Sequence, residues 1–192
     1  MSFAWYEQVP HNTTISQGDL LRDCPVIGWS DDLRRQAESP EQLLGEAESV
    51  DCIVMSQACD LEQGHLRNVI ACPMYTLAEY RPLWEQAVTA SRQNPTEKNW
   101  RRWLDEISAG RTWNLAMINA HAPAEAEALR AEVMLVDFHE ILSLPRIFLE
   151  SWALRVGLPR LRLLPPYREH LSQAFARYFM RVGLPVEIER NW

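Results

Sequence analysis

VDCIVMS (residues 50–56) and VIACPM (residues 69–74) are two short apolar runs rich in β-branched residues. Such runs favour strands that are buried on at least one face. Between them lies EQGH (residues 62–65), which carries the glycine of a turn. The two runs therefore predict an antiparallel strand pair.

The flanking segments extend this β-rich pattern. Gly18-Asp19 predicts a turn before a short strand, and Pro25 restricts that strand to a sheet edge because proline has no backbone N–H. Residues 30–49 are polar and acidic, and we interpret them as a loop insertion. Residues 113–118 and 133–138 predict further strands.

Helical spacing replaces the strand pattern in two regions. Residues 78–110 predict a two-helix insertion, broken around Pro95 and ended by Gly110. Ser143 and Pro145 carry the features of a helix start. A tail helix is predicted from about Pro166 to Val182, with an apolar side made of Leu171, Phe175, Tyr178, Phe179 and Val182.

The composition and net charge exclude several classes of protein. The chain has 192 residues, 47% of them hydrophobic, which predicts one folded domain. A net charge of -7 argues against a protein that coats duplex DNA by bulk phosphate neutralisation. With no signal peptide and no run of about 18 apolar residues, we expect no membrane association, a cytoplasmic location and four reduced thiols.

Three separated segments resemble the MazF/PemK family of toxin ribonucleases, which share a small SH3-like β-barrel. They are QGDL (residues 17–20), the strand pair at 50–74, and VMLVDFHEILSL (residues 133–144). The resemblance implies an α+β fold, with a small antiparallel barrel built from about 15–76 and 111–142. A helical insertion at about 78–110 and a C-terminal helical region at about 143–192 would complete a single domain, 1–192. It also implies a homodimer.

The family's catalytic residues are not all matched. In the family, an arginine precedes the strand that corresponds to residues 53–56. The matching position in this chain is Val50 or Asp51. The family's threonine falls at Tyr75 or Thr76. Without the arginine, the developing phosphorane charge has no evident stabiliser. The resemblance therefore implies a non-catalytic module in a bacterial toxin–antitoxin or phage-defence setting that binds nucleic acid or a partner protein.

The corner after the first apolar run is the candidate site, because side chains leave a barrel wall where a strand ends. Gln57, Cys59, Asp60 and Arg67 would line a groove there. Cys59 and His65 could form a thiolate–imidazole pair oriented by Asp60. In the alternative function, an endoribonuclease, Asp60 or His65 is the base and Arg67 the phosphate clamp. The competing interpretation is a buried thiol at Cys59 and a turn cap at Asp60.

The tail helix supplies a second set of candidates. Arg168 and Arg177 are predicted to contact an anion, unless the polar face is simply solvated and neutralised by Glu169. The tryptophans of the insertion, Trp84, Trp100, Trp103 and Trp113, are interpreted as core or partner-docking residues, with base stacking as the alternative. A chain that serves only as a protein-interaction subunit, docking through this insertion, is a third functional class.

Metal binding is a weaker alternative. Cys24, Cys59 and Cys72, completed by His65 or His11, have ligand chemistry, but their spacing contains no tight Cys-x-x-Cys pair. We therefore expect ordinary thiols, with no metal and no cofactor.

Overall fold

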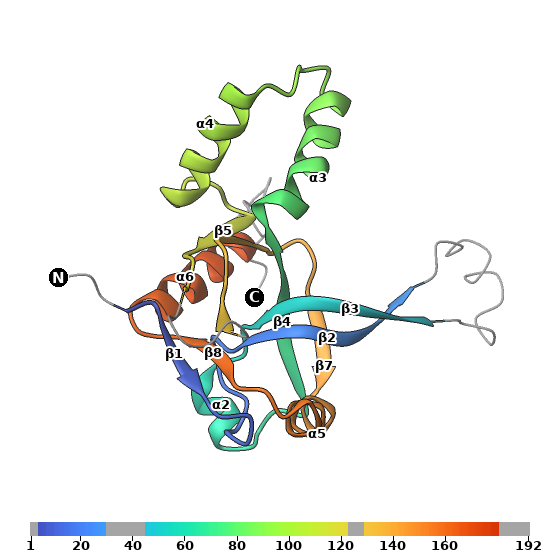
Figure 1. The fold of residues 1–192 in the computed structure, drawn as a ribbon, viewed down its shortest axis with the longest axis vertical. Coiled ribbons are helices and arrows are strands. Elements are labelled where there is room, and N and C mark those ends of the chain that lie inside the picture. Colours follow the sequence, from blue (N-terminus) through green and yellow to red (C-terminus); the bar gives the residue numbers. More distant parts are fainter. Residues whose placement is uncertain (1–3, 30–44, 123–128, 181–192) are drawn as a thin grey trace, which may run out of the picture.

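The computed structural model describes residues 4–29, 45–122 and 129–180 (Figure 1). The strands are β1 (Tyr6–Val9), β2 (Leu20–Trp29), β3 (Gly45–Val54), β4 (Asn68–Thr76), β5 (Leu115–Ile118), β6 (Met134–Asp137), β7 (Leu142–Pro145) and β8 (Arg160–Leu163). The helices are α2 (Ala58–Glu62), α3 (Leu77–Ala90), α4 (Glu97–Ser108), α5 (Arg146–Val156) and α6 (Tyr167–Phe179). The strand pairs are antiparallel, which confirms the predicted α+β class.

β4 is the central strand of the main sheet. It pairs with β3, with Ile53 opposite Cys72, as the two apolar runs predicted. Its first residues pair with β7 and its last residues with β6. β2 continues the sheet beyond β3, and β5 continues it beyond β6. The strands within 17–28, 50–74 and 133–142 therefore lie in one sheet.

The sheet is not closed into a barrel by the ladders of the described residues. β2 and β5 stand at opposite ends of the strand order. β1 and β8 form a separate two-stranded sheet, which meets the start of β2 through a single bridge between Asp19 and Arg162. Beside β5 lie α4 and α6, and a helix offers no free strand edge that could continue the ladder. As predicted, Pro25 lies in an edge strand.

Two sequence predictions are wrong here. Residues 45–49, expected in a loop, form the first half of β3 and pair with residues 25–29 of β2. All five are exposed, so this ribbon lacks the alternation of apolar and polar residues that marks a half-buried strand. Residues 30–44 of the predicted loop lie outside the described residues.

Ser143 is the second error, because it lies in β7 and does not cap a helix. Its Oγ accepts a hydrogen bond from Asn68 Nδ2 of the paired strand at 3.2 Å. α5 begins at Arg146, with Pro145 as the N-cap residue. Strand pairing with β4 has thus displaced the helix start by two residues.

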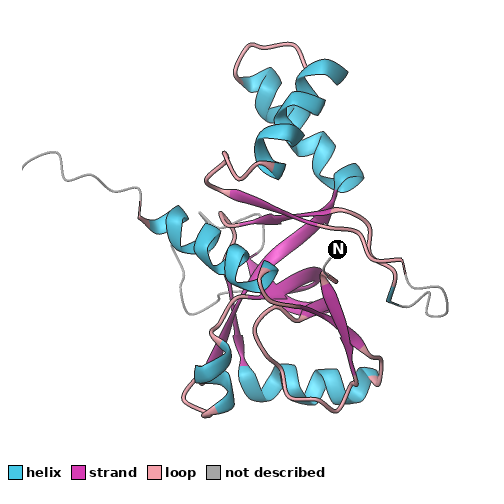
Figure 2. Ribbon diagram, turned by 90° about the vertical axis from the view of Figure 1, so that its left-hand side faces the viewer, coloured by secondary structure: helices cyan, strands magenta, loops and turns pink. Residues whose placement is uncertain are grey.

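α3 and α4 form the predicted insertion, which projects beyond the sheet (Figures 1 and 2). Trp84 and Trp100 are buried and meet edge to face, and Tyr80 stacks on Trp103. The rings make the core of the hairpin itself, as the packing interpretation held. Trp84 and Trp100 are therefore core residues of the hairpin, and neither ring is exposed for base stacking or docking. None of the helices in the described ranges has the length and apolar character needed to span a bilayer.

Two apolar clusters cover the two faces of the main sheet. Ile53 belongs to the cluster that receives Leu171 of α6, whereas Cys52 and Val54 belong to the cluster that receives Leu149 of α5. This division follows from the strand period, because successive side chains point to opposite faces. The two helices thus take opposite sides of the sheet, and Figure 2 shows them well separated.

Asp19 holds the two-stranded sheet of β1 and β8 against the main sheet. Its side chain is fully buried and accepts hydrogen bonds from Arg160 Nε at 2.7 Å and from Arg162. Arg160 also donates to the carbonyl oxygens of Thr13 at 2.6 Å and Thr14 at 3.0 Å. One carboxylate therefore ties the start of β2, the loop before it and β8 together.

Replacing Asp19 should be the most damaging change to this ion-pair network. Asp19→Asn leaves two arginines without their anion, and breaking a buried ion pair from one side costs about 3–5 kcal/mol. Urea denaturation measures the loss of unfolding free energy. Glu85→Gln is the control, because it removes an exposed pair with Arg81 worth about 0.3–0.5 kcal/mol. Equal losses for the two variants would contradict this assignment.

Candidate binding site

The predicted corner, residues 57–67, connects β3 to β4 through α2. Gly64 turns the chain back with a φ of 72°, a left-handed conformation that suits glycine. Ser56 is buried, and its Oγ accepts the N–H of Ile70 at 2.8 Å. The corner itself faces solvent, since the exposed residues include Gln57, Cys59, His65 and Arg67.

The catalytic pairs predicted at this corner are not formed. Cys59 Sγ lies 4.0 Å from Asp60 Oδ1, and His65 meets Asp60 only through a backbone hydrogen bond of 3.1 Å. Of the described residues, none is joined to His65 or Arg67 by a side-chain hydrogen bond that would make a base or a clamp. Cys59 is exposed, so the interpretation of it as a buried thiol is also wrong.

The alternative metal set is not assembled either. Cys24 and Cys72 are buried in different apolar clusters, and Cys59 is exposed. Within residues 4–29, 45–122 and 129–180, no three His, Cys, Asp or Glu side chains come together as metal ligands.

The two arginines predicted on the tail helix have different surroundings. Arg168 donates to Glu169 Oε1 through Nε at 3.1 Å and Nη2 at 2.8 Å, so its charge is compensated by its neighbour. Gln17 Nε2 donates to Ser172 Oγ at 2.7 Å, which fastens the first half of α6 to the loop before β2. Arg177, by contrast, forms no ion pair with a carboxylate of the described residues.

Arg177 lines a cavity of about 560 Å³ between α6, β5 and the end of α4. We call this cavity the α6 groove. Its volume is within the range of ligand sites. Arg111 is also in its wall, but that guanidinium is held by Glu106 at 2.6 Å, and this hydrogen bond lowers the pKa of the Glu106 carboxyl. The other polar residues in its wall are Ser108, Thr112 and His170.

Two aromatic stacks stand near the two ends of the α6 groove. Trp5 stacks on Tyr167 with ring centroids 3.8 Å apart, and Trp113 stacks on Tyr178 at 5.6 Å. Residues 167 and 178 are three helical turns apart, or about 16 Å along the axis. Trp5, Trp113 and Tyr167 line the cavity itself. The groove thus offers aromatic surfaces with Arg177 beside them.

The structure also reveals a carboxylate–histidine pair that the sequence interpretation missed. Asp137 Oδ1 accepts the backbone N–H of His139 and lies 3.0 Å from its Nδ1. Tyr80 donates its hydroxyl to the other oxygen, at 3.0 Å, and this buried, charged surrounding raises the pKa of the Tyr80 hydroxyl. The imidazole lies edge-on to both rings of the Trp113–Tyr178 stack. A base held in this way is oriented for proton transfer.

The signal for this pair was present in DFH, residues 137–139. An aspartate side chain often accepts the backbone N–H two residues further on, as in an Asx-turn, so Asp137 and His139 could have been paired at the end of the strand. Only the apolar pattern of this segment entered the prediction.

Comparisons of this chain with protein-family models, with curated proteins and with solved structures find no match. The MazF/PemK resemblance therefore stays a prediction.

Thiol reactivity tests how the cysteines are placed. Cys59 is exposed, whereas Cys24, Cys52 and Cys72 have 0% exposure. Burial raises the pKa of Cys72 to about 12, so this thiol stays protonated near neutral pH. The native protein should show one thiol that reacts rapidly with Ellman's reagent, and Cys59→Ser should remove that phase. Rapid reaction of a second thiol would contradict the structure.

Proposed function

We propose that this chain is a non-catalytic binding module for single-stranded nucleic acid, with a nucleotide seated in the α6 groove. The proposal rests on the surroundings of Arg177. Its guanidinium has no carboxylate partner among the described residues, and it lines a cavity with aromatic walls. A guanidinium matches phosphate geometry, and aromatic rings stack on bases of any sequence.

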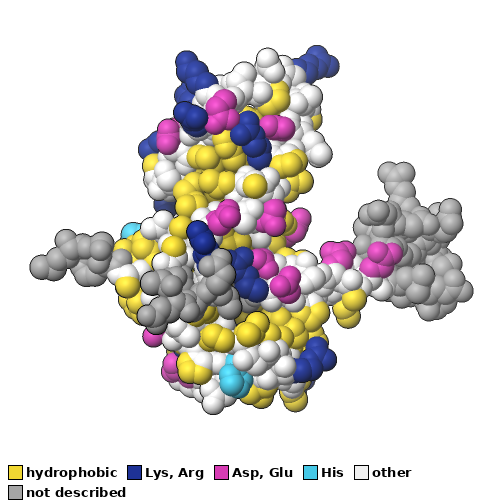
Figure 3. Space-filling view, viewed as in Figure 1, with side chains coloured by type: hydrophobic (Ala, Val, Ile, Leu, Met, Phe, Trp, Pro, Cys, Tyr) yellow, Lys and Arg dark blue, Asp and Glu magenta, His cyan; other side chains and the backbone are white. Residues whose placement is uncertain are grey.

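The charge distribution limits the kind of binding. The net charge is -7, and acidic side chains lie among the basic ones on the face shown in Figure 3. Binding of this kind would depend on a local contact, with about one phosphate neutralised per site, and its salt dependence would be weak.

The MazF/PemK-like build and the toxin–antitoxin or phage-defence setting belong to this proposal. The family's SH3-like barrel would here be an opened form, with the main sheet as its wall. The environment of the two catalytic positions favours binding over cleavage. Asp51, at one place of the missing arginine, accepts from Arg22 and from the N–H of Asp23. Thr76 caps α3 through reciprocal hydrogen bonds with Glu79.

The proposal predicts that Arg177→Ala weakens the binding of a fluorescein-labelled, mixed-sequence oligoribonucleotide by about ten- to hundredfold, because a charge-assisted hydrogen bond contributes about 1.5–3 kcal/mol. Fluorescence anisotropy at several salt concentrations measures this, and the salt slope should fall by about one. Arg101→Ala is the control, since Arg101 pairs with Glu97 on α4.

Wild-type protein that binds neither RNA nor single-stranded DNA would overturn the proposal. Salt-insensitive binding to a protein alone would favour the third class, an interaction subunit.

The Asp137–His139 pair favours the endoribonuclease as the second candidate function. In this candidate, His139 is the general base instead of Asp60 or His65, and Asp137 orients it. Should purified protein cleave single-stranded RNA, His139→Ala is expected to remove the activity and His65→Ala to leave it. Gel analysis of the RNA distinguishes the two, and cleavage unaffected by His139→Ala would exclude this candidate.

A further inference from the structure

Two buried thiols lie close together on the neighbouring strands β2 and β3. Cys24 and Cys52 both have 0% exposure and belong to the apolar cluster under α5. The pKa of each thiol is shifted chiefly by the other thiol, so the two side chains are neighbours. The proposed function uses neither of them.

A β-bulge brings these thiols to the same face. Leu21 is opposite Cys52 and Cys24 is opposite Val50, so two residues, Arg22 and Asp23, face Asp51 alone. Asp23 has a φ of 50°, a left-handed conformation that is uncommon for a residue with a side chain. Asp51 holds the bulge by accepting the Asp23 N–H at 2.9 Å and a bond from Arg22. The extra residue shifts Cys24 onto the side of β3 that Cys52 occupies.

The influence of each thiol on the other makes the two sulfurs chemically unequal. It lowers the pKa of Cys24 and raises that of Cys52, whose burial acts in the same direction. Cys24 is therefore the better nucleophile of the two, because the thiolate is the reactive form.

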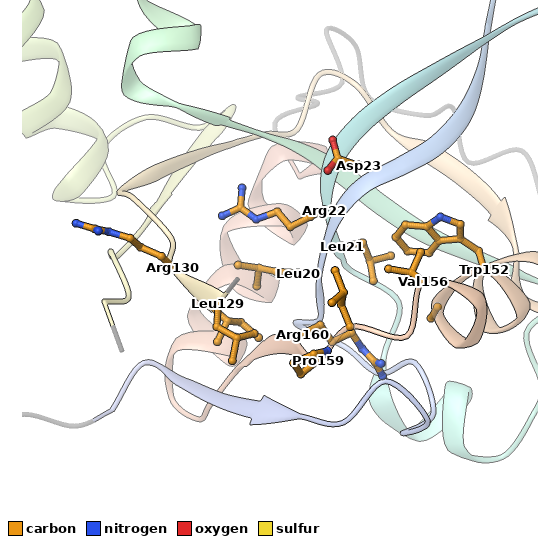
Figure 4. A pocket seen from close by; sticks show the side chains of 13 residues that line it. Leu20, Leu21, Arg22, Asp23, Leu129, Arg130, Trp152, Val156, Pro159 and Arg160 are labelled. Atoms are coloured by element: carbon orange, nitrogen blue, oxygen red, sulfur yellow. The ribbon is translucent and has the colours of Figure 1, made fainter. Parts of the chain in front are cut away.

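A small cavity lies beside the apolar cluster that holds the pair. It has a volume of about 170 Å³ and lies between β2, the second half of α5 and residues 158–161 (Figure 4). Leu21, Trp152 and Ala153 are in its wall and also pack in the cluster that holds both cysteines. A molecule as small as hydrogen peroxide fits this space, next to the apolar cluster that holds the two thiols.

We propose that Cys24 and Cys52 are a site of oxidative modification, at which hydrogen peroxide converts the two thiols into a disulfide across the β2–β3 bulge. The Cys24 thiolate attacks one peroxide oxygen, the O–O bond breaks, and hydroxide leaves with the formation of a sulfenic acid. Cys52 then attacks that sulfur, forms the S–S bond and releases water. In total, two thiols and one peroxide give one disulfide and two waters.

The test uses the folded full-length chain with Cys59→Ser, because Cys59 shares a tryptic peptide with Cys52. After peroxide treatment and removal of excess oxidant, the protein is denatured, alkylated with iodoacetamide and digested without reductant. The expected product is a mass in which residues 23–34 are joined to residues 36–67, two hydrogens lighter than the sum of the peptides. Dithiothreitol should separate it into the two peptides.

Cys72 is the internal control, since its tryptic peptide, residues 68–92, should be recovered alkylated. Recovery of the Cys24 and Cys52 peptides in alkylated form at every peroxide concentration that leaves the circular dichroism spectrum native would overturn the proposal. A cross-link to Cys72 would also overturn it. Neither result depends on nucleic-acid binding, because the α6 groove is formed by other elements.

Discussion

The buried carboxylate of Asp19 is the constraint on which the rest of the structure depends. It is the acceptor for Arg160 and Arg162 at once, and an ion without water must find such partners to remain charged. Because both arginines belong to β8, this contact fixes where β8 lies against the sheet. α6 begins four residues after β8, so the position of the α6 groove follows from the same contact.

Much of the fold was predictable because it follows from local patterns. The apolar runs at 50–56 and 69–74 gave the β3–β4 pair, Pro25 marked an edge strand, and helical spacing gave the 78–110 insertion. The errors arose where tertiary pairing outweighs local pattern. Residues 45–49 are polar on both faces and form a strand only because β2 offers them a partner.

The site was harder to predict because it depends on which segments converge. Sequence reasoning named Arg177, but nothing local indicates that Trp5, more than 160 positions earlier, stacks on Tyr167 of the same helix. The corner at 57–67 is exposed as predicted, but its polar groups face solvent or hydrogen-bond to the backbone and do not form the predicted pairs. Side-chain chemistry could be identified from the sequence, whereas the partner of each side chain could not.

The tryptophans show why the partner of a side chain, and not only its chemistry, matters for function. Trp84 and Trp100 have aromatic partners within the helical hairpin and are buried in its core. Trp113 follows the hairpin, is 43% exposed and has its ring against Tyr178 and the His139 imidazole. The exposed part of this side chain lies in the wall of the α6 groove, and its packing would limit the conformational entropy lost on binding. The proposed nucleotide binding would therefore use the aromatic residues that join α6 to the sheet, and it would depend on the contacts of Gln17 and Asp19 that position α6.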